Sequence, residues 1–365
     1  MKILAFPRDP NPYQRLLYSE MERLGAQVSY LGQLTPSRTL NLLLLPAEMA
    51  ARRAGGARLV HLHWVFGFAL PGADRFPILR RLAQAWFGVW LRAAQKLGLR
   101  MVWTAHNVLP HSRVFADDAA ARRALTCRCD LVLAHSPAAL AGLAELGAVP
   151  QRSLVIRHGP MGPAVPAALR VPGSGDGPRE FLFFGKVAEY KGVEELLAAF
   201  NDLPEGTPAR LTVVGQCDDP DLRARLTAAG NVRFRLEHVP EHEVAGLLAS
   251  ADAVVLPFRQ VTTSGSAELA LSHARPLIVP DLPGLAGLPA AAVVRYDGSV
   301  RGLTAALADL ANADRSRLAA MSAAASAYSA QVSWREIAAA TLSAMESVIS
   351  GSYRAGVRPS AAAST

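Results

Sequence analysis

The chain of 365 residues contains little cysteine and no long apolar run. Its three cysteines, Cys127, Cys129 and Cys217, are too few for a disulfide framework, which favours a reducing compartment. Cys127 and Cys129 also lack the two-residue spacing and the second pair that a zinc knuckle needs. No stretch approaches the roughly 18 consecutive apolar residues of a membrane span, and the apolar run at 2–6 is too short for a signal peptide. We therefore expect a cytoplasmic protein.

Several catalytic motifs are also missing. The sequence has no His-Glu-x-x-His, no Gly-x-Ser-x-Gly and no Gly-x-Gly-x-x-Gly. These absences exclude zincin proteases, lipase-type hydrolases and the standard dinucleotide fingerprint. The segment Cys217–Asp221 contains an Asp-x-Asp pattern, but its proline and acids at an expected helix start favour capping over metal binding.

Acidic residues are scarce in the first half of the chain. Residues 1–170 carry 21 lysines and arginines against 9 aspartates and glutamates, whereas residues 171–365 carry 17 and 21. This excess of positive charge predicts an anionic partner for the first half, either nucleic acid or a phospholipid surface.

Apolar segments of strand length alternate with amphipathic helical segments along the chain, which predicts parallel sheets covered by helices on both faces. The expected strands are 2–6, 59–64, 100–104, 131–134, 154–157, 181–184, 211–215, 253–257 and 277–280. Ten of the twenty residues from Gly159 to Pro178 are glycine or proline, which indicates a linker. We expect two doubly wound, Rossmann-like α/β domains facing each other across a cleft, with ligands at the carboxyl ends of strands.

The loop after the strand at 181–184 contains Gly185, Lys186, Lys191 and Gly192. Two lysines beside a glycine-rich helix start suit an anion such as a phosphate, although the loop lacks the Walker spacing. Two interpretations remain open here, a phosphate site and an ordinary solvated turn.

The loop after the strand at 253–257 is rich in small hydroxyl residues and precedes a helix with an early acid. Backbone amides and hydroxyls at such a helix start suit a phosphate. Glu268 either hydrogen-bonds a ribose diol or only complements the helix dipole. The residues concerned are Gln260, Thr262, Thr263, Ser264, Gly265, Ser266 and Glu268.

A third candidate follows the strand at 100–104. His106, Asn107 and His111 lie in a loop interrupted by proline, and His158 has a similar place after the last strand of the first half. A histidine at a strand end either donates to a sugar hydroxyl and relays a proton, or is a satisfied structural residue.

The segment from Arg75 to Arg100 has a helical apolar stripe with basic residues among it. Much of that stripe belongs to a core. Trp86 and Trp90 beside basic side chains nevertheless fit a helix lying at a membrane interface, so both interpretations remain open.

The motifs of the second half resemble the donor-binding domain of glycosyltransferase family 4, which has the GT-B fold. The resemblance implies that Lys186 and Lys191 hold the donor diphosphate and that Glu268 binds the ribose. Lys186 replaces the usual arginine, and Gln260 replaces the first glutamate of the family's Glu-x7-Glu motif. The amides around Thr262 to Ser266 would take the place of the family's glycine-rich phosphate segment.

The segment 103–111 resembles bacterial transferases that build exopolysaccharide or lipid-linked glycans. That resemblance implies His106 at the donor sugar, with Asn107, His111 and His158 on the acceptor side. It also implies a cytoplasmic hexosyltransferase that uses a nucleoside-diphosphate sugar, needs no metal or other cofactor, and works at the inner face of the plasma membrane.

The implied domains are residues 1–165 for the acceptor and 166–335 for the donor. A helix at 336–350 crosses back to the first domain, and 351–365 form a disordered tail. Two alternatives remain from other classes: a basic nucleic-acid-binding protein and a nucleotide-sugar epimerase of similar form.

Overall fold

The computed structural model describes residues 1–110, 112–162, 177–226 and 230–352. Two compact units make up the chain: Met1–Arg157 with Trp334–Thr365, and His158–Ser333. Most of the expected linker, most of the expected tail and His111 lie outside the described residues.

The first unit is built on a six-stranded parallel sheet in the order β2-β1-β3-β4-β5-β6. Its strands are β1 (Lys2–Phe6), β2 (Gln27–Tyr30), β3 (Leu59–Leu62), β4 (Arg100–Ala105), β5 (Leu131–Ala134) and β6 (Ser153–Val155). The strand order reverses between β1 and β3, so the loops after these two strands diverge there.

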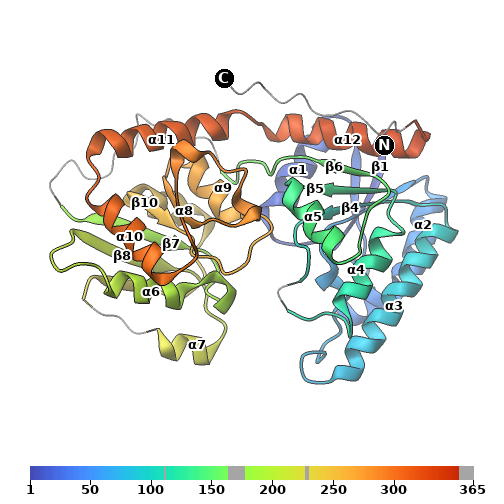
Figure 1. The fold of residues 1–365 in the computed structure, drawn as a ribbon. Helices are drawn as coiled ribbons and strands as arrows, with labels where there is room; N and C mark the ends of the chain where they lie inside the picture. The colour runs from blue at the N-terminus through green and yellow to red at the C-terminus, as the bar shows by residue number, and fades with distance from the viewer. Residues whose placement is uncertain (111, 163–176, 227–229, 353–365) are drawn as a thin grey trace. The chain divides into compact units, whose positions relative to one another are not determined.

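Helices cover both faces of the first sheet (Figure 1). They are α1 (Pro12–Arg23), α2 (Arg38–Ala54), α3 (Pro77–Lys96), α4 (Asp118–Thr126), α5 (Pro137–Glu145) and α12 (Trp334–Ser350), with the 3-10 turn η1 (Val65–Phe68). The last helix, α12, packs along α1. The ring of Trp334 meets the ring of Tyr13 edge-on, with 5.2 Å between centroids. A segment from the far end of the sequence therefore completes this unit.

The second unit has a six-stranded parallel sheet in the order β12-β11-β10-β7-β8-β9. Its strands are β7 (Arg179–Phe184), β8 (Ala209–Val214), β9 (Val232–Arg235), β10 (Ala253–Val255), β11 (Leu277–Pro280) and β12 (Val293–Tyr296). Counted from β7, this is the 3-2-1-4-5-6 order of a dinucleotide fold, and the order reverses between β7 and β10.

The helices of the second unit also lie on both faces of its sheet (Figure 1). They are α6 (Val193–Asn201), α7 (Pro220–Arg225), α8 (Glu241–Ser250), α9 (Gly265–Ser272), α10 (Val300–Ala311) and α11 (Arg315–Ala330). Three 3-10 turns complete the unit: η3 (Glu189–Lys191), η4 (Pro283–Leu285) and η5 (Ala290–Ala292).

Alternate residues of β7 enter two separate cores. Phe181 and Phe183 pack with α6 and α10, whereas Leu182 packs with α8, α9 and α11. A strand that is buried on both faces needs a continuous apolar run, which is what the Phe-Leu-Phe-Phe segment provides. Both units are doubly wound α/β domains, which confirms the predicted fold class.

All nine expected strands are present, and three strands were missed: β2, β9 and β12. Each of the three is at the edge of its sheet. An edge strand has one neighbour and keeps polar side chains exposed, as the arginines of the Val-Arg-Phe-Arg segment of β9 do. The apolar run that identifies a central strand is therefore absent from these segments.

Candidate functional site

The two phosphate-binding candidates of the second half follow β7 and β10, the neighbouring strands at which the strand order reverses. The loop after β7 runs from Gly185 to Gly192, and the loop after β10 runs from Leu256 to Ser264. Because both strands are parallel, both loops leave the same edge of the sheet. Ligands of open α/β sheets bind at such a reversal point.

Close backbone contacts hold the two loops together. Gly192 has φ of 70°, and a Cβ there would lie 1.9 Å from the carbonyl oxygen of Pro257. The amide of Arg259 donates to the carbonyl of Tyr190 at 3.0 Å. A side chain at position 192 would therefore break the junction between the loops.

The two lysines of the first loop have different surroundings. The Nζ of Lys191 lies 4.3 Å from the ring centroid of Phe258 and 5.2 Å from that of Tyr190. Desolvation by these neighbours lowers the pKa of Lys191 to about 8. Lys186 is exposed and forms an ion pair of 2.8 Å with Asp218. Lys191 is thus a desolvated cation at the junction, and Lys186 an exposed cation with a carboxylate partner.

The hydroxyl-rich loop ends in a helix start. The side chain of Ser264 caps α9 by accepting a hydrogen bond from the amide of Ala267 at 3.1 Å. Gly265 is the first helical residue, and a Cβ on Gly185 would lie 3.1 Å from Oγ of Ser266. The structure therefore brings the start of α9 next to the end of β7.

Thr263 contributes a buried hydroxyl oxygen that has no hydrogen-bond partner among the described residues. Glu268, in the first turn of α9, is buried, and its Oε1 accepts a hydrogen bond of 3.3 Å from the hydroxyl of Tyr328 on α11. Its role thus goes beyond complementing the helix dipole. Gln260 is exposed at the tip of the same loop, and Thr262 is half-buried beside it.

In the first unit, His106 follows β4 and is buried within a group of aromatic side chains. Its ring stacks on Trp64 with 4.5 Å between centroids and meets Tyr13 edge-on at 4.6 Å. The ring nitrogens of His106 lie 3.0 Å from Nδ1 of His63 and 3.3 Å from Nε2 of His135. Sequence reasoning missed both partners, although His63 lies near the end of one predicted strand and His135 directly follows another.

The other candidates of this group are separate. Asn107 is half-buried in the loop after His106. His158 belongs to the second unit, is buried, and its Nδ1–H donates to the carbonyl of Gly159 at 2.8 Å. His111 is outside the described residues.

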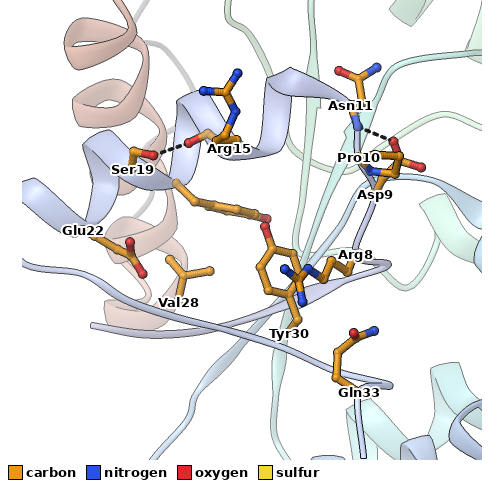
Figure 2. Close-up of a pocket in the computed structure, with 11 residues that line it drawn as sticks. Arg8, Asp9, Pro10, Asn11, Arg15, Ser19, Glu22, Val28, Tyr30 and Gln33 are labelled. Atoms are coloured by element: carbon orange, nitrogen blue, oxygen red, sulfur yellow. Dashed lines mark hydrogen bonds between the residues drawn. The ribbon is translucent and has the colours of Figure 1, made fainter. Parts of the chain in front are cut away.

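A cavity of about 660 Å³ opens in the first unit, beside the loop after β1 (Figure 2). Its walls combine two arginines, two acids, amide groups and two tyrosines; they include Arg8, Asp9, Asn11, Arg15, Tyr18, Glu22, Tyr30 and Gln33. The guanidinium of Arg8 lies 5.6 Å from the ring centroid of Tyr30. Polar groups that can both donate and accept, around an aromatic ring, suit a sugar.

The structure corrects the interface interpretation for Trp90 alone, because Trp86 is only half-buried. The helical period turns Trp90 into the core, where it is fully buried, and the Nε1–H of Trp86 donates to the carbonyl of Leu42 at 3.0 Å. The exposed apolar side chains of this segment are instead Phe76, Ile78, Leu82 and Val89.

The acidic segment after β8 acts as a cap, as predicted. The side chain of Asp219 accepts hydrogen bonds from the amides of Asp221 and Leu222 at the start of α7. Among the described ranges, no three His, Cys, Asp or Glu side chains gather in a way that could hold a metal ion.

A family model described as glycosyl transferases group 1 matches residues 178–313, the segment that contains both loops. Residues 178–313 are therefore similar to the glycosyl transferases group 1 domain. This match confirms the resemblance that the two loop motifs indicated.

Among curated proteins, the chain is similar to a GDP-mannose:glycolipid 4-beta-D-mannosyltransferase of Xanthomonas campestris pv. campestris. The two are 29% identical over 238 residues, a region that covers 61% of this chain and 61% of that protein. The chain thus spans 61% of the length of the curated relatives that it matches.

Among solved structures, sucrose-phosphate synthase from Thermosynechococcus elongatus aligns with a TM-score of 0.73 at 16% identity. The alignment covers 96% of this chain and all of that one. Anabaena HepE, solved in complex with UDP and glucose, aligns with a TM-score of 0.68 at 16% identity over 95% of this chain and all of that one. These likenesses concern the fold alone, and they confirm the predicted GT-B class.

The buried histidines predict a pH-dependent stability of the first unit. Burial lowers the pKa of His61 to about 3, whereas an unfolded histidine titrates near 6.5. Between these values the unfolded state binds the extra proton, so stability falls as the pH falls. From pH 6.5 to 5 we expect His61 alone to cost on the order of 2 kcal/mol in the free energy of unfolding.

Urea titrations at pH 7 and pH 5, followed by tryptophan fluorescence, measure this effect, because all five tryptophans lie in the first unit. The His61→Gln variant should lose less stability than the wild-type protein over this interval. An equal loss in both proteins would contradict the assignment.

Proposed function

We propose that this chain is a metal-independent glycosyltransferase that moves a sugar from a nucleoside-diphosphate sugar to a lipid-linked glycan in polysaccharide synthesis. The observation that carries the proposal is the meeting of two anion-binding loops where the strand order of the second sheet reverses. The family match covers both loops. The nucleic-acid-binding alternative accounts for neither loop, and the match to a glycosyltransferase family model favours transfer over epimerisation.

The donor lies at the second unit in this proposal. Lys191 and Lys186 stabilise the charge that develops on the departing diphosphate, and the amides at the start of α9 bind its oxygens. The hydroxyl of Thr263 is available for the same purpose. Glu268 accepts hydrogen bonds from the ribose diol, with Tyr328 holding its other oxygen in place.

The acceptor lies at the first unit, on the side of Asn107, whereas His106 is assigned to the donor sugar. The Xanthomonas relative is named for a GDP-mannose donor and a glycolipid acceptor. The excess of positive charge in residues 1–170 supports an anionic acceptor or an anionic membrane surface.

Replacement of Lys191 tests the donor assignment. We expect Lys191→Ala to lower kcat/KM for the nucleotide sugar by about 100-fold or more, because a desolvated cation at the developing charge is lost. The assay is release of nucleoside diphosphate from GDP-mannose and UDP-glucose, and thermal shifts with GDP, UDP and dTDP identify the base. Lys96→Ala, an exposed lysine of the first unit, is the matched control. Full turnover by Lys191→Ala would overturn the donor assignment.

The lowered pKa of Lys191 predicts pH-dependent binding of the diphosphate. Since the pKa of the free protein is about 8, an anion that binds the charged form must raise this pKa and take up protons. We expect the Kd of the preferred nucleoside diphosphate to rise between pH 7 and 9, by up to about ten-fold per unit above pH 8.

Isothermal titration in buffers of different ionisation enthalpy measures the proton uptake directly. The Lys191→Arg variant keeps its charge throughout this range and should show a flatter profile. Identical profiles in the two proteins would exclude Lys191 as the titrating group.

Membrane contact through the first unit is part of this proposal. None of the helices in the described part of the chain is long and apolar enough to cross a bilayer. Phe76, Ile78 and Leu82 are more than half exposed near the start of α3, and Arg75 and Arg81 are exposed beside them. Apolar side chains flanked by cations suit the surface of an anionic bilayer.

Co-sedimentation with phosphatidylglycerol-containing vesicles tests this contact. We expect the double variant Ile78→Ser/Leu82→Ser to bind such vesicles at least about ten-fold more weakly, because two inserting side chains are lost. Val149→Ser removes an equally exposed apolar side chain outside the patch and should bind like the wild-type protein. Unchanged binding by the double variant would remove this patch from the proposal.

A further inference from the structure

A continuous chain of hydrogen-bonding side chains crosses the carboxyl edge of the first sheet. Its members come from β3 and β4 and from the loops after β3, β4, β5 and β6, together with one tyrosine of α1. In order, they are Thr104, His61, Tyr18, His63, His106, His135 and the carbonyl of Ile156. The six spacings range from 2.6 to 3.3 Å.

The carbonyl at the last position and a neutral His135 together set the direction of the whole chain. A peptide carbonyl only accepts hydrogen bonds, so Nδ1 of His135, 3.0 Å from the Ile156 oxygen, must carry a proton. Neutral His135 then has a bare Nε2, which accepts from Nδ1–H of His106. By the same step, Nε2 of His106 accepts from Nδ1–H of His63.

The same assignment of donors and acceptors extends to Thr104, at the other end of the chain of hydrogen bonds. The hydroxyl of Tyr18 donates to Nε2 of His63 and accepts from Nδ1–H of His61, whose Nε2 accepts from the hydroxyl of Thr104. With His135 neutral, the other three rings are neutral Nδ1–H tautomers as well. Burial lowers the pKa of His61 and His63, which is consistent with neutral rings.

This arrangement leaves His106 without a ring nitrogen for a substrate. Nδ1 donates within the chain and Nε2 accepts within it. Trp64 covers one face of the ring, and Tyr13 meets it edge-on. The chain also ends at a carbonyl that cannot pass a proton on, so it does not carry protons out of the site.

Asn107, the residue after His106, has a side chain outside this chain of hydrogen bonds. The side chain of Asn107 forms no hydrogen bond with the described residues and is half-buried in the loop after β4. Its amide offers two donors and one acceptor oxygen, a set that matches a sugar hydroxyl. Because it directly follows His106, its placement depends on how firmly that ring is held.

We infer that His106 is a positioning residue, held by the histidine chain, and that Asn107 makes the hydrogen bond to a sugar hydroxyl of the substrate. The second part of this inference rests on the proposed glycosyltransferase function, whereas the tautomer assignment does not. His63 and His135 then act on the reaction only through His106.

The first experiment needs no activity. Full-length protein with 15N-labelled histidine is measured at pH 7 by long-range proton–nitrogen correlation, and single His→Gln variants assign the rings. We expect His61, His63, His106 and His135 as neutral Nδ1–H tautomers, the minor form of free imidazole in water. A charged or Nε2–H ring at His106 would overturn the inference. The His135→Gln variant should change the nitrogen shifts of His106 and His63.

The second experiment uses turnover of the nucleotide sugar. We expect Asn107→Ala to lower kcat/KM by about ten-fold, which corresponds to the loss of one neutral hydrogen bond. The single variants His106→Gln and His135→Gln should each lower kcat/KM by a similar factor. The pH profile of kcat should keep its shape in His106→Gln. If the rise or the fall of kcat with pH disappeared in His106→Gln, His106 would be a catalytic acid or base, and the positioning role would be overturned.

Normal kinetics in Asn107→Ala would overturn the substrate contact. If no nucleotide sugar is turned over by the wild-type protein, the proposed function fails, while the tautomer spectrum still decides the hydrogen-bond chain. The two failures are therefore distinguishable.

Discussion

The contact between the loops after β7 and β10 is the constraint on which the second unit depends. Gly192 allows the loops to approach because any side chain would collide with the carbonyl of Pro257. The approach in turn places Phe258 against the ammonium group of Lys191. A cation that loses solvent without gaining a carboxylate is costly in the free protein, and its lowered pKa measures that cost. An anionic ligand at the junction would relieve it.

In the proposed donor site, the two lysines interact with the diphosphate under different conditions. Lys186 keeps its solvent and pairs with Asp218, so an anion must compete with an existing partner to reach it. Lys191 has aromatic neighbours, and the desolvation that lowers its pKa also strengthens its attraction for a diphosphate. A hydrated, screened ion pair contributes little, whereas a desolvated cation contributes more in the same field. The more buried lysine should therefore dominate donor binding.

Much of the fold could be predicted from the sequence, because central strands of a parallel sheet need continuous apolar runs. The edge strands β2, β9 and β12 could not be predicted, since one side of each remains polar. The loops after β7 and β10 were predictable as anion sites from glycine, lysine and hydroxyl content. The contact between the two loops was not predictable, because it depends on strand order. That order brings β10 beside β7, although some 70 residues separate them in the chain.

The histidine chain shows a second limit of sequence reasoning. Each histidine taken alone lies in an apolar strand or directly after one, and nothing in its local sequence distinguishes a ligand from a structural residue. The decisive information is that β3, β4, β5 and β6 are consecutive neighbours in one sheet. Parallel neighbours bring their carboxyl ends to one edge, so side chains from four distant segments form one line of hydrogen bonds. A residue in that line is held by its neighbours, and a ring whose two nitrogens both bond other protein groups has no lone pair left to offer a substrate.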